Sequence, residues 1–507
     1  MKLLTYVKIT YTLQTAAIAA LVFVLFTFAP KLKQQFQLAK IPALSKSKDA
    51  RTGLLKSVKE IYIEGYKKFK DGVYYMATSD GEEAVVIPPS LMPELRALPD
   101  DFLSFPKAVV RIMAEEYTKF SLDLPVAAHI VKSDLTPALA RLNAIIFSEV
   151  QAAMRQHLPP CDDWTEVCIN SQLMKIIAQV SGRIFVGPAL SQDPDYLDIR
   201  CTFTKVLGDA VTAVKRMRPW LRPFLASGLP EIKKLRAIEK RAAKHLEPIV
   251  RERIEAEKND PNWQKPEDLM QWLLTRTSQQ GHAVTVESAA TLQLGLIFAA
   301  VHTTTLSATN IVYSLASTPE YIQPLREEIA SAIADNGGEF TSRALQQMVK
   351  LDSYMKEAVR VNPPSMSSFN RRVLKDITLS NGQRIPKGVM LEVPSYAVYM
   401  DAANYPSPST FNPFRHSNLR ASGSSIDNAR SQFVSANETN LSFGYGRHAC
   451  PGRFFATNEI KLVLTRLILD YDIKMPLGRI ERWEQLAVGR TMMPDPTKSI
   501  MLKRVAV

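Results

Sequence analysis

Residues 443–455 read Phe-Gly-Tyr-Gly-Arg-His-Ala-Cys-Pro-Gly-Arg-Phe-Phe and hold one thiol, Cys450, in a loop framed by glycine and proline. Gly444 and Gly446 allow positive φ angles and a close approach of the backbone to a flat ligand. A helix over about 453–469 is expected to follow, and its positive end would lie beside the sulfur and favour the thiolate. Because no second cysteine lies nearby, the pattern indicates a ligand to a single iron, and therefore haem, rather than zinc or an iron–sulfur cluster.

A buried core thiol in a glycine-rich turn is the structural alternative, but the spacing favours a ligand. The loop resembles the haem-ligand signature of the cytochrome P-450 superfamily, Phe-x-x-Gly-x-Arg-x-Cys-x-Gly, in a version similar to that of fungal microsomal members. It matches the signature at Phe443, Gly446, Cys450 and Gly452. The resemblance implies haem b (iron protoporphyrin IX) with Cys450 as the axial ligand. His448 replaces the family's propionate-binding arginine, so either His448 or the preceding Arg447 is expected to make that contact.

Length and composition narrow the class of protein. No Gly/Ser-rich linker divides the 507 residues after residue 60, so one catalytic domain over residues 61–507 is expected. The net charge of +13 is dispersed among acids without an aromatic platform, which argues against nucleic acid and favours anionic lipid and an acidic redox partner. Four cysteines in so long a chain form no disulfide framework and indicate a reducing compartment.

An uncharged run of 22 residues, 9–30, is long enough to cross a membrane as one helix. A cleaved signal peptide is the alternative, but such peptides usually have a shorter apolar region and a cleavage site of small residues. Basic residues gather in the linker at 31–60 and are fewer in residues 1–8, so residues 1–8 are expected in the lumen and the catalytic domain in the cytosol. We therefore expect a single-pass protein of the endoplasmic reticulum membrane.

The remaining chain combines two short strand pairs with many segments of helical periodicity. Residues 72–78 and 83–87 read as a strand pair, and residues 373–380 and 384–393 as a hairpin about Asn381-Gly382. Helices are expected from apolar spacing at 137–157, 165–183, 231–258, 265–277, 319–335, 342–349 and 352–361. The predicted fold class is mainly α with small β-sheets after one N-terminal transmembrane helix, and the resemblance implies the cytochrome P-450 fold.

Residues 288–319 contain no Asp, Glu, Lys or Arg and are by length a second candidate for a membrane span. Their middle, residues 302–310, is rich in hydrogen-bonding side chains, which lipid cannot satisfy. We therefore predict a long helix that crosses the protein interior and lines a cavity.

Residues 299–304, Ala-Ala-Val-His-Thr-Thr, resemble the family's oxygen-binding segment, Ala/Gly-Gly-x-Asp/Glu-Thr-Thr. Small side chains at Ala299 and Ala300 leave room for O₂. The Thr303 hydroxyl can bond a backbone carbonyl one turn back and open the helix to water, which gives a proton path. His302 stands in the place of the family's acid and can also relay protons, although an imidazole need not be charged. The alternative is a structural turn in which His302 only satisfies a buried carbonyl.

Glu357 and Arg360 lie three residues apart on an expected helix and can form a forked ion pair. Alone, such a pair is usually a solvated surface contact. Its place before two prolines and a hairpin resembles the family's Glu-x-x-Arg element, and Arg415 lies in a segment that resembles the one whose arginine joins that pair. The resemblance implies a structural network of these three residues beneath the haem, and a propionate contact from Arg371 or the adjacent Arg372.

One feature of the family is missing. Many members carry an early Trp-x-x-x-Arg that reaches the propionates, but residues 129–141 contain no tryptophan. His129 and Lys132 are the candidates to replace it. Apart from this difference, the resemblance spans essentially residues 60–500.

The resemblance implies a membrane-anchored haem-thiolate monooxygenase. Electrons would come from NADPH through a separate NADPH-cytochrome reductase, with cytochrome b5 as an optional second donor, and O₂ would be the co-substrate. By analogy with fungal members, the substrate is a bulky apolar secondary metabolite such as a diterpene, indole diterpene or meroterpenoid. Two alternatives are a haem-thiolate isomerase or dehydratase that uses no O₂, and a non-catalytic haem-binding sensor.

Overall fold

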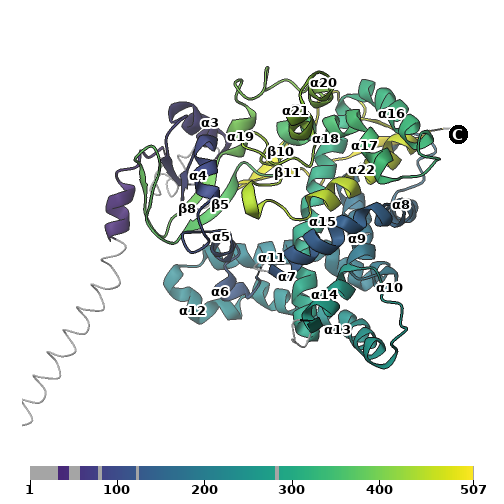
Figure 1. Ribbon diagram of the computed structural model, residues 1–507, viewed down its shortest axis with the longest axis horizontal. Helices are drawn as coiled ribbons and strands as arrows, with labels where there is room; N and C mark the ends of the chain where they lie inside the picture. The colour runs from purple at the N-terminus through teal and green to yellow at the C-terminus, as the bar shows by residue number, and fades with distance from the viewer. Residues whose placement is uncertain (1–31, 45–57, 78–82, 122–124, 280–284, 506–507) are drawn as a thin grey trace, which may run out of the picture. The chain divides into compact units, whose positions relative to one another are not determined.

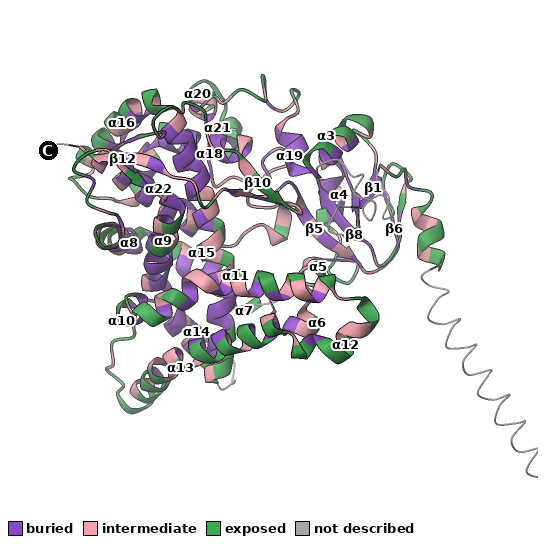
Figure 2. Ribbon diagram, turned by 180° about the vertical axis from the view of Figure 1, so that it is seen from behind, coloured by how far each residue is buried: buried purple, intermediate pink, exposed green. Residues whose placement is uncertain are grey.

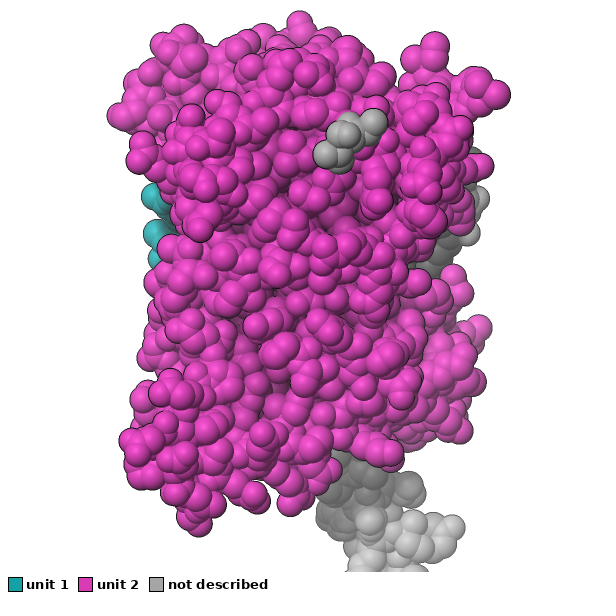
Figure 3. Space-filling view, turned by 90° about the vertical axis from the view of Figure 1, so that its right-hand side faces the viewer, with its two compact units in different colours: residues 1–105, 369–394 teal, residues 106–368, 395–507 magenta. Residues whose placement is uncertain are grey.

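The computed structural model describes residues 32–44, 58–77, 83–121, 125–279 and 285–505. Backbone contacts divide the chain into two compact units. Unit 1 is Met1–Phe105 with Phe369–Pro394, and unit 2 is Pro106–Ser368 with Ser395–Val507 (Figure 3). The predicted anchor at 9–30 and the predicted lumenal residues 1–8 lie outside the described residues.

Unit 1 is built on a five-stranded sheet with the strand order β1-β2-β8-β5-β3. β1 (Tyr74–Ala77) and β2 (Glu83–Val86) are antiparallel, which confirms the first predicted strand pair. β2 pairs in parallel with β8 (Met390–Val393), and β3 (Leu103–Ser104) is antiparallel to β5 (Ser368–Val373). The unit also contains a short helix at 32–38, α3 (Val58–Lys68) and α4 (Met92–Arg96).

The second predicted hairpin is shorter than its sequence pattern indicates. β6 (Ile377–Thr378) and β7 (Arg384–Ile385) pair around Gly382, whose φ of 80° suits a tight turn. The rest of the predicted second strand is β8, which lies inside the five-stranded sheet instead. All four residues of β8 are buried, and a strand of that kind is favoured in the interior of a sheet.

Unit 2 is mainly helical with small sheets (Figure 1), so the prediction of a mainly α fold with small β-sheets is confirmed. Its helices are α5 (Phe105–Ile112), α6 (Glu115–Thr118), α7 (Pro125–Ile130), α8 (Thr136–His157), α9 (Ile169–Phe185), α10 (Pro188–Ser191), α11 (Pro194–Arg216), α12 (Arg222–Leu225), α13 (Pro230–Asn259), α14 (Leu269–Gln279), α15 (Val286–Ser317), α16 (Ile322–Ala334), α17 (Ser342–Gln347), α18 (Val349–Val361), α19 (Ser395–Tyr399), α20 (Arg415–Ser422), α21 (Ser425–Ser431) and α22 (Arg453–Asp470). A π-helical turn, Val131–Leu135, joins α7 to α8. A sheet of order β4-β12-β9 and a β10–β11 hairpin contain β4 (Thr165–Val167), β9 (Tyr471–Lys474), β10 (Gln485–Val488), β11 (Thr491–Pro494) and β12 (Ile500–Arg504).

The helices that were predicted from apolar spacing are all present, with small shifts at their ends. α9 begins at Ile169 rather than at 165, because Thr165–Val167 pairs with β12 as strand β4. The helix predicted after the Cys450 loop is α22, and it begins directly after Gly452. Local spacing therefore predicts that a helix exists, whereas its ends depend on distant partners.

α15 is the long interior helix that residues 288–319 predict. Thr285 and Ser288 cap its first turn with reciprocal hydrogen bonds. Among the described residues it is the only helix long and apolar enough to span a membrane, but 61 % of its apolar window is buried inside the protein. It packs against α9, α11, α13, α18 and α22, so protein rather than lipid covers most of it.

Candidate active site

The loop around Cys450 is shaped by its own backbone. The Cys450 N–H donates to the Phe443 carbonyl at 2.8 Å, and a 3-10 turn, Gly446–His448, lies between them. Gly444 and Gly446 have φ angles of 75° and 71°, a region that glycine adopts without strain. Cys450 therefore lies at a fixed place just before the first turn of α22.

The surroundings of the sulfur favour a ligand to a cation. Burial raises the pKa of the Cys450 thiol above its ordinary value, while the backbone N–H of Gly452 and then Arg453 act to lower it. The thiol thus keeps its proton until a cation replaces it, and a coordinating thiol is deprotonated outright. A single half-buried sulfur with N–H groups directed at it suits a thiolate ligand to iron.

The two candidates for one propionate contact bond to each other. Arg447 Nε donates to His448 Nε2 at 3.2 Å. Since Nε2 of His448 accepts this bond, the ring proton resides on Nδ1. Arg447 is exposed and His448 is half-buried, so both retain surface from which a donor can reach a ligand. Which of the two binds a propionate stays a prediction.

Ala299 and Thr303 form one stripe along the middle of α15. Both are exposed in a helix that is otherwise largely buried, so the described residues leave this stripe open. The Thr303 hydroxyl donates to the Ala299 carbonyl at 2.6 Å, which is the bond to the preceding turn that the sequence predicts. Ala300 is half-buried beside them. The stripe thus combines small side chains with one hydroxyl.

His302 lies on a different stripe, because consecutive residues of a helix are turned by about 100°. Its Nε2 atom lies 3.2 Å from the carbonyl oxygen of Cys201 on α11. Burial lowers the pKa of His302 to about 4, although the bond to Cys201 opposes this shift. The imidazole is therefore neutral near pH 7 and donates through Nε2–H.

Glu357, Arg360 and Arg415 meet in one buried cluster on α18 and α20, and α18 is drawn largely as buried in Figure 2. Arg360 donates to the two carboxylate oxygens of Glu357 at 2.7 Å and 2.8 Å, and Arg415 Nε donates at 3.2 Å. Burial acts to raise the pKa of Glu357, but the bonds from Arg360 and a contact with His416 outweigh it and lower that pKa to about 2. The carboxylate is therefore ionised and well compensated.

A fourth side chain of this cluster was not predicted. His416 Nε2 lies 3.6 Å from Glu357 Oε2, which is an electrostatic contact longer than a hydrogen bond. Burial lowers the pKa of His416 to about 4, so its ring is neutral near pH 7. The available signal was its position directly after Arg415, because the start of α20 brings both side chains to the same carboxylate.

Arg371 belongs to unit 1, where it is buried on β5. Its guanidinium lies over the ring of Phe369 at 4.2 Å and near that of Phe105 at 5.4 Å. Nη1 donates to the carbonyl of Asn370 at 2.9 Å. These contacts fix the guanidinium within unit 1, and its role toward a propionate stays a prediction, as does that of Arg372.

The candidates to replace the missing tryptophan lie near the end of α7. His129 and Lys132 are both exposed, one in α7 and one in the π-helical turn. His129 Nδ1 lies 3.4 Å from the Ser133 hydroxyl. Their exposure is compatible with a contact to a ligand, and neither assignment goes beyond a prediction.

The residues of unit 2 fit a haem. α22, which follows Cys450, packs against α15, which carries Ala299 and Thr303. The two positive-φ glycines of the loop allow a flat ligand to approach the backbone, as the sequence predicts. A half-buried thiol that can bind a cation and an open stripe of small side chains on an adjacent helix are the features that such a ligand requires.

Comparison with known proteins agrees with this fit. The cytochrome P450 family model matches residues 134–501. The cytochrome P450 monooxygenase ATR3 of Stachybotrys chlorohalonatus is 39 % identical over 429 residues, which cover 83 % of this chain and 89 % of that protein. The cytochrome P450 monooxygenase TES1 of Alternaria alternata is 35 % identical over 501 residues, covering 97 % and 94 %.

Two more distant similarities bear on function and fold. The ent-kaurene oxidase P450-4 of Gibberella fujikuroi is 32 % identical over 448 residues, covering 87 % of this chain and 86 % of that protein. The solved structure of retinoic acid bound cyanobacterial CYP120A1 has a TM-score of 0.64 at 19 % identity and covers 87 % of this chain and 93 % of its own. The latter shows the fold alone.

Proposed function

This chain belongs to the cytochrome P450 family and is an oxidoreductase of the monooxygenase class, and we propose that it oxidises a bulky apolar secondary metabolite, by hydroxylation or a related step. The single observation that carries the proposal is that α22, which follows Cys450, packs against α15, which carries the open Ala299–Thr303 stripe. Cys450 provides a thiolate ligand and the stripe provides space for O₂ and substrate.

Each residue has a separate task in this proposal. Haem, when bound, supplies the activation of O₂ with electrons from NADPH, delivered by a separate reductase. Cys450 would hold the iron through its sulfur, and the glycines of the loop would allow the close approach. Thr303 holds water and moves a proton at its hydroxyl, which already bonds the Ala299 carbonyl. Ala299 and Ala300 have small side chains, so they leave room for O₂ beside the substrate.

The substrate class rests on similarity. A relative that covers most of the chain is named an ent-kaurene oxidase, which indicates a diterpene as one candidate. We therefore propose a diterpene, indole diterpene or meroterpenoid as substrate.

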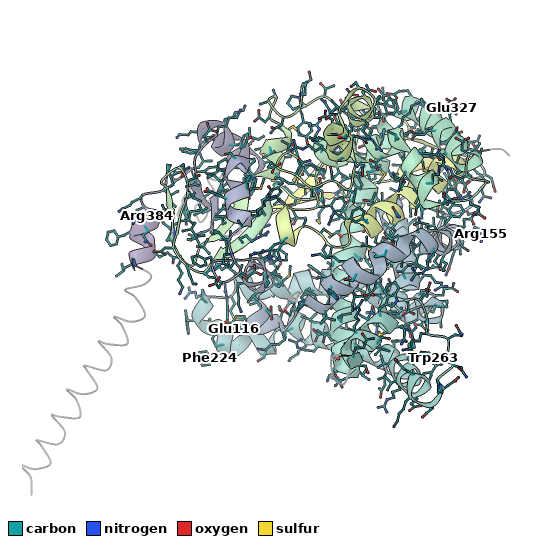
Figure 4. All side chains as sticks on the ribbon, in the orientation of Figure 1. Glu116, Arg155, Phe224, Trp263, Glu327 and Arg384 are labelled. Carbon is teal, nitrogen blue, oxygen red and sulfur yellow. The ribbon has the colours of Figure 1, made fainter. Side chains whose placement is uncertain are left out.

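The membrane location is also a proposal. It is supported by the uncharged run at 9–30 and the basic residues that follow it. In unit 2, the side chains of Trp220, Phe224 (Figure 4) and Leu225 are 65 %, 77 % and 52 % exposed, which provides further apolar surface for lipid. An NADPH-cytochrome reductase, with cytochrome b5 as an optional donor, would meet the protein at the cytosolic side of the endoplasmic reticulum.

The test is to feed candidate terpenoids to cells that express the protein together with a reductase and to read the product masses. A product heavier by one oxygen atom, dependent on NADPH and O₂, is the expected result. Turnover without NADPH would support an isomerase or dehydratase instead. Absence of turnover with every terpenoid class would refute the substrate proposal.

The ligand itself is tested by spectroscopy. Cys450→Ala should abolish the strongly red-shifted Soret band that thiolate ligation gives to the reduced carbonyl complex. The matched controls Cys161→Ala, Cys168→Ala and Cys201→Ala should retain the band. Retention of the band in Cys450→Ala would overturn the assignment of the axial ligand.

A further inference from the structure

We infer that His302 is a positioning residue, which fixes α11 to α15 through an Nε2–H bond to the Cys201 carbonyl and so sets the width of the space beside Thr303. The inference rests on the proposed oxidation of a substrate in that space. It assigns to the position of the family's acid a task other than proton delivery.

The first support is the direction of the side chain. Ala299 and Thr303 share one stripe of α15, and Phe298 and His302 share the next, because residues four apart lie on the same face. The first stripe is exposed, whereas Phe298 and His302 are half-buried. Helix α11 packs against α15, and the His302 ring reaches its backbone. His302 therefore faces a neighbouring helix rather than the stripe of Thr303.

The second support is the close packing of the turn of α11 that accepts the bond. Arg200, the residue before Cys201, is 1 % exposed, and its guanidinium packs against α9. A Cβ atom at Gly182 of α9 would lie only 1.4 Å from Arg200 Nη1, so the guanidinium occupies the place of a side chain there. The carbonyl that His302 meets thus belongs to a turn that also packs against a third helix.

The third support is an aromatic contact that joins the same two helices. The ring of Phe120 lies 5.4 Å from that of Phe298 on α15 and 5.6 Å from that of Phe203 on α11. Phe298 is one turn before His302, and Phe203 is two residues after Cys201. The polar bond and the aromatic contacts therefore hold α11 and α15 together over the same short length.

The chemistry of the bond distinguishes a positioning role for His302, here called the clamp, from a proton relay. A backbone carbonyl only accepts, so the partner at position 302 must donate, and a neutral imidazole does so through Nε2–H. A carboxylate in this place would only accept and would face the Cys201 oxygen without a proton between them. A relay, in contrast, would work with the carboxylate that the family usually has.

Four variants separate these possibilities. Glutamine places a donor near the position of Nε2, asparagine places it closer to the backbone, alanine removes it, and aspartate replaces it with an acceptor. We expect His302→Gln to retain wild-type amide hydrogen exchange in peptides that cover α11. Exchange there should be roughly fivefold faster in His302→Ala and His302→Asn, and fastest in His302→Asp, as for the loss of one net hydrogen bond.

A second readout follows the width of the space. The bulky apolar azole clotrimazole serves as the probe, and its dissociation constant for the haem-loaded protein should follow the same order, with His302→Gln close to wild type and a roughly fivefold increase in His302→Ala. His157→Gln is the matched control, because His157 Nε2 bonds Gln179 between two other helices at 2.9 Å. This variant should leave exchange in α11 unchanged.

Wild-type exchange in all four variants would overturn the clamp. So would wild-type exchange and clotrimazole binding in His302→Asp together with loss of both in His302→Gln, because the two measurements would then not follow the presence of a donor at position 302. If His302→Asp yields no haem-loaded protein, the comparison of His302→Gln with His302→Asn carries the test. None of these outcomes depends on turnover. The terpenoid-feeding experiment tests the proposed function separately, so the two failures are distinguishable.

Discussion

Arg360→Ala removes the two donors that lie closest to Glu357, at 2.7 Å and 2.8 Å, from a site in which none of the Glu357 side chain is exposed. Removal of one partner from a buried ion pair costs roughly 3–5 kcal/mol, because the other charge stays buried. Arg415 Nε and the Asn412 N–H still donate to the carboxylate. We therefore expect a loss near the lower limit, about 3 kcal/mol of the free energy of unfolding.

Glu357→Ala should be worse, with a loss of about 5 kcal/mol, because it leaves two buried guanidiniums without their carboxylate. Arg360 would keep hydrogen bonds to the carbonyls of Tyr399 and Pro408, which are dipoles rather than charges. A folded domain is stable by only about 5–15 kcal/mol. Both variants should therefore yield much less folded, haem-loaded protein.

The measurement is equilibrium unfolding in guanidinium chloride, followed by circular dichroism and by haem absorbance. Arg141→Ala is the matched control, because Arg141 pairs with Glu267 at 2.9 Å while both side chains are 54 % exposed. Such a surface pair contributes less than about 1 kcal/mol. If Arg360→Ala and Glu357→Ala lose no more stability than Arg141→Ala, the reasoning about the buried network is wrong.

Three other predictions concern acid, proton delivery and the membrane. The pKa of Glu357 is lowered from 4.5 to about 2 in the folded protein, so its contribution to the free energy of unfolding is present above about pH 4.5 and is lost as the pH falls toward 2. The loss of stability with falling pH should therefore be less steep in Glu357→Gln, and an unchanged slope would contradict this. Thr303→Ala should continue to consume NADPH but release hydrogen peroxide instead of product, and unchanged product per NADPH would remove Thr303 from the proton path. Deletion of residues 1–30 should release much of the protein from membranes without loss of haem, although exposed apolar side chains can retain a fraction. In sealed microsomes, protection of the catalytic domain of the full chain from protease would refute its cytosolic orientation.

Features that depend on neighbours in sequence were predictable. The Cys450 loop, the start of α22 and the Glu357–Arg360 pair each involve residues within one or two turns, so spacing alone places them together. α15 was predictable for a related reason, since a charge-free run with hydroxyls in its middle is favoured only in a protein interior.

Features that depend on distant residues were not predictable. The contact of His302 with Cys201 joins positions 101 residues apart, and no local pattern indicates which carbonyl a buried imidazole meets. β8 reads as one half of a hairpin, yet it pairs with β2 because its four buried residues need cover on both faces. His416 follows a recognised arginine, but only the fold shows that its ring reaches Glu357.

The discontinuity of unit 1 has a consequence for how the chain folds during synthesis. β1, β2 and β3 leave the ribosome early, but β5 and β8, which lie between β2 and β3 in the sheet, are made only with Phe369–Pro394. Residues 106–368 separate the two segments, and at about 5–20 residues per second their synthesis takes roughly 13–53 s. During that interval β2 and β3 present unpaired edges that can associate with other chains. Lower growth temperatures, and chaperones that cover strand edges, should therefore raise the yield of native protein. The gain should be larger than for a chain whose sheets form from strands that are consecutive in the sequence.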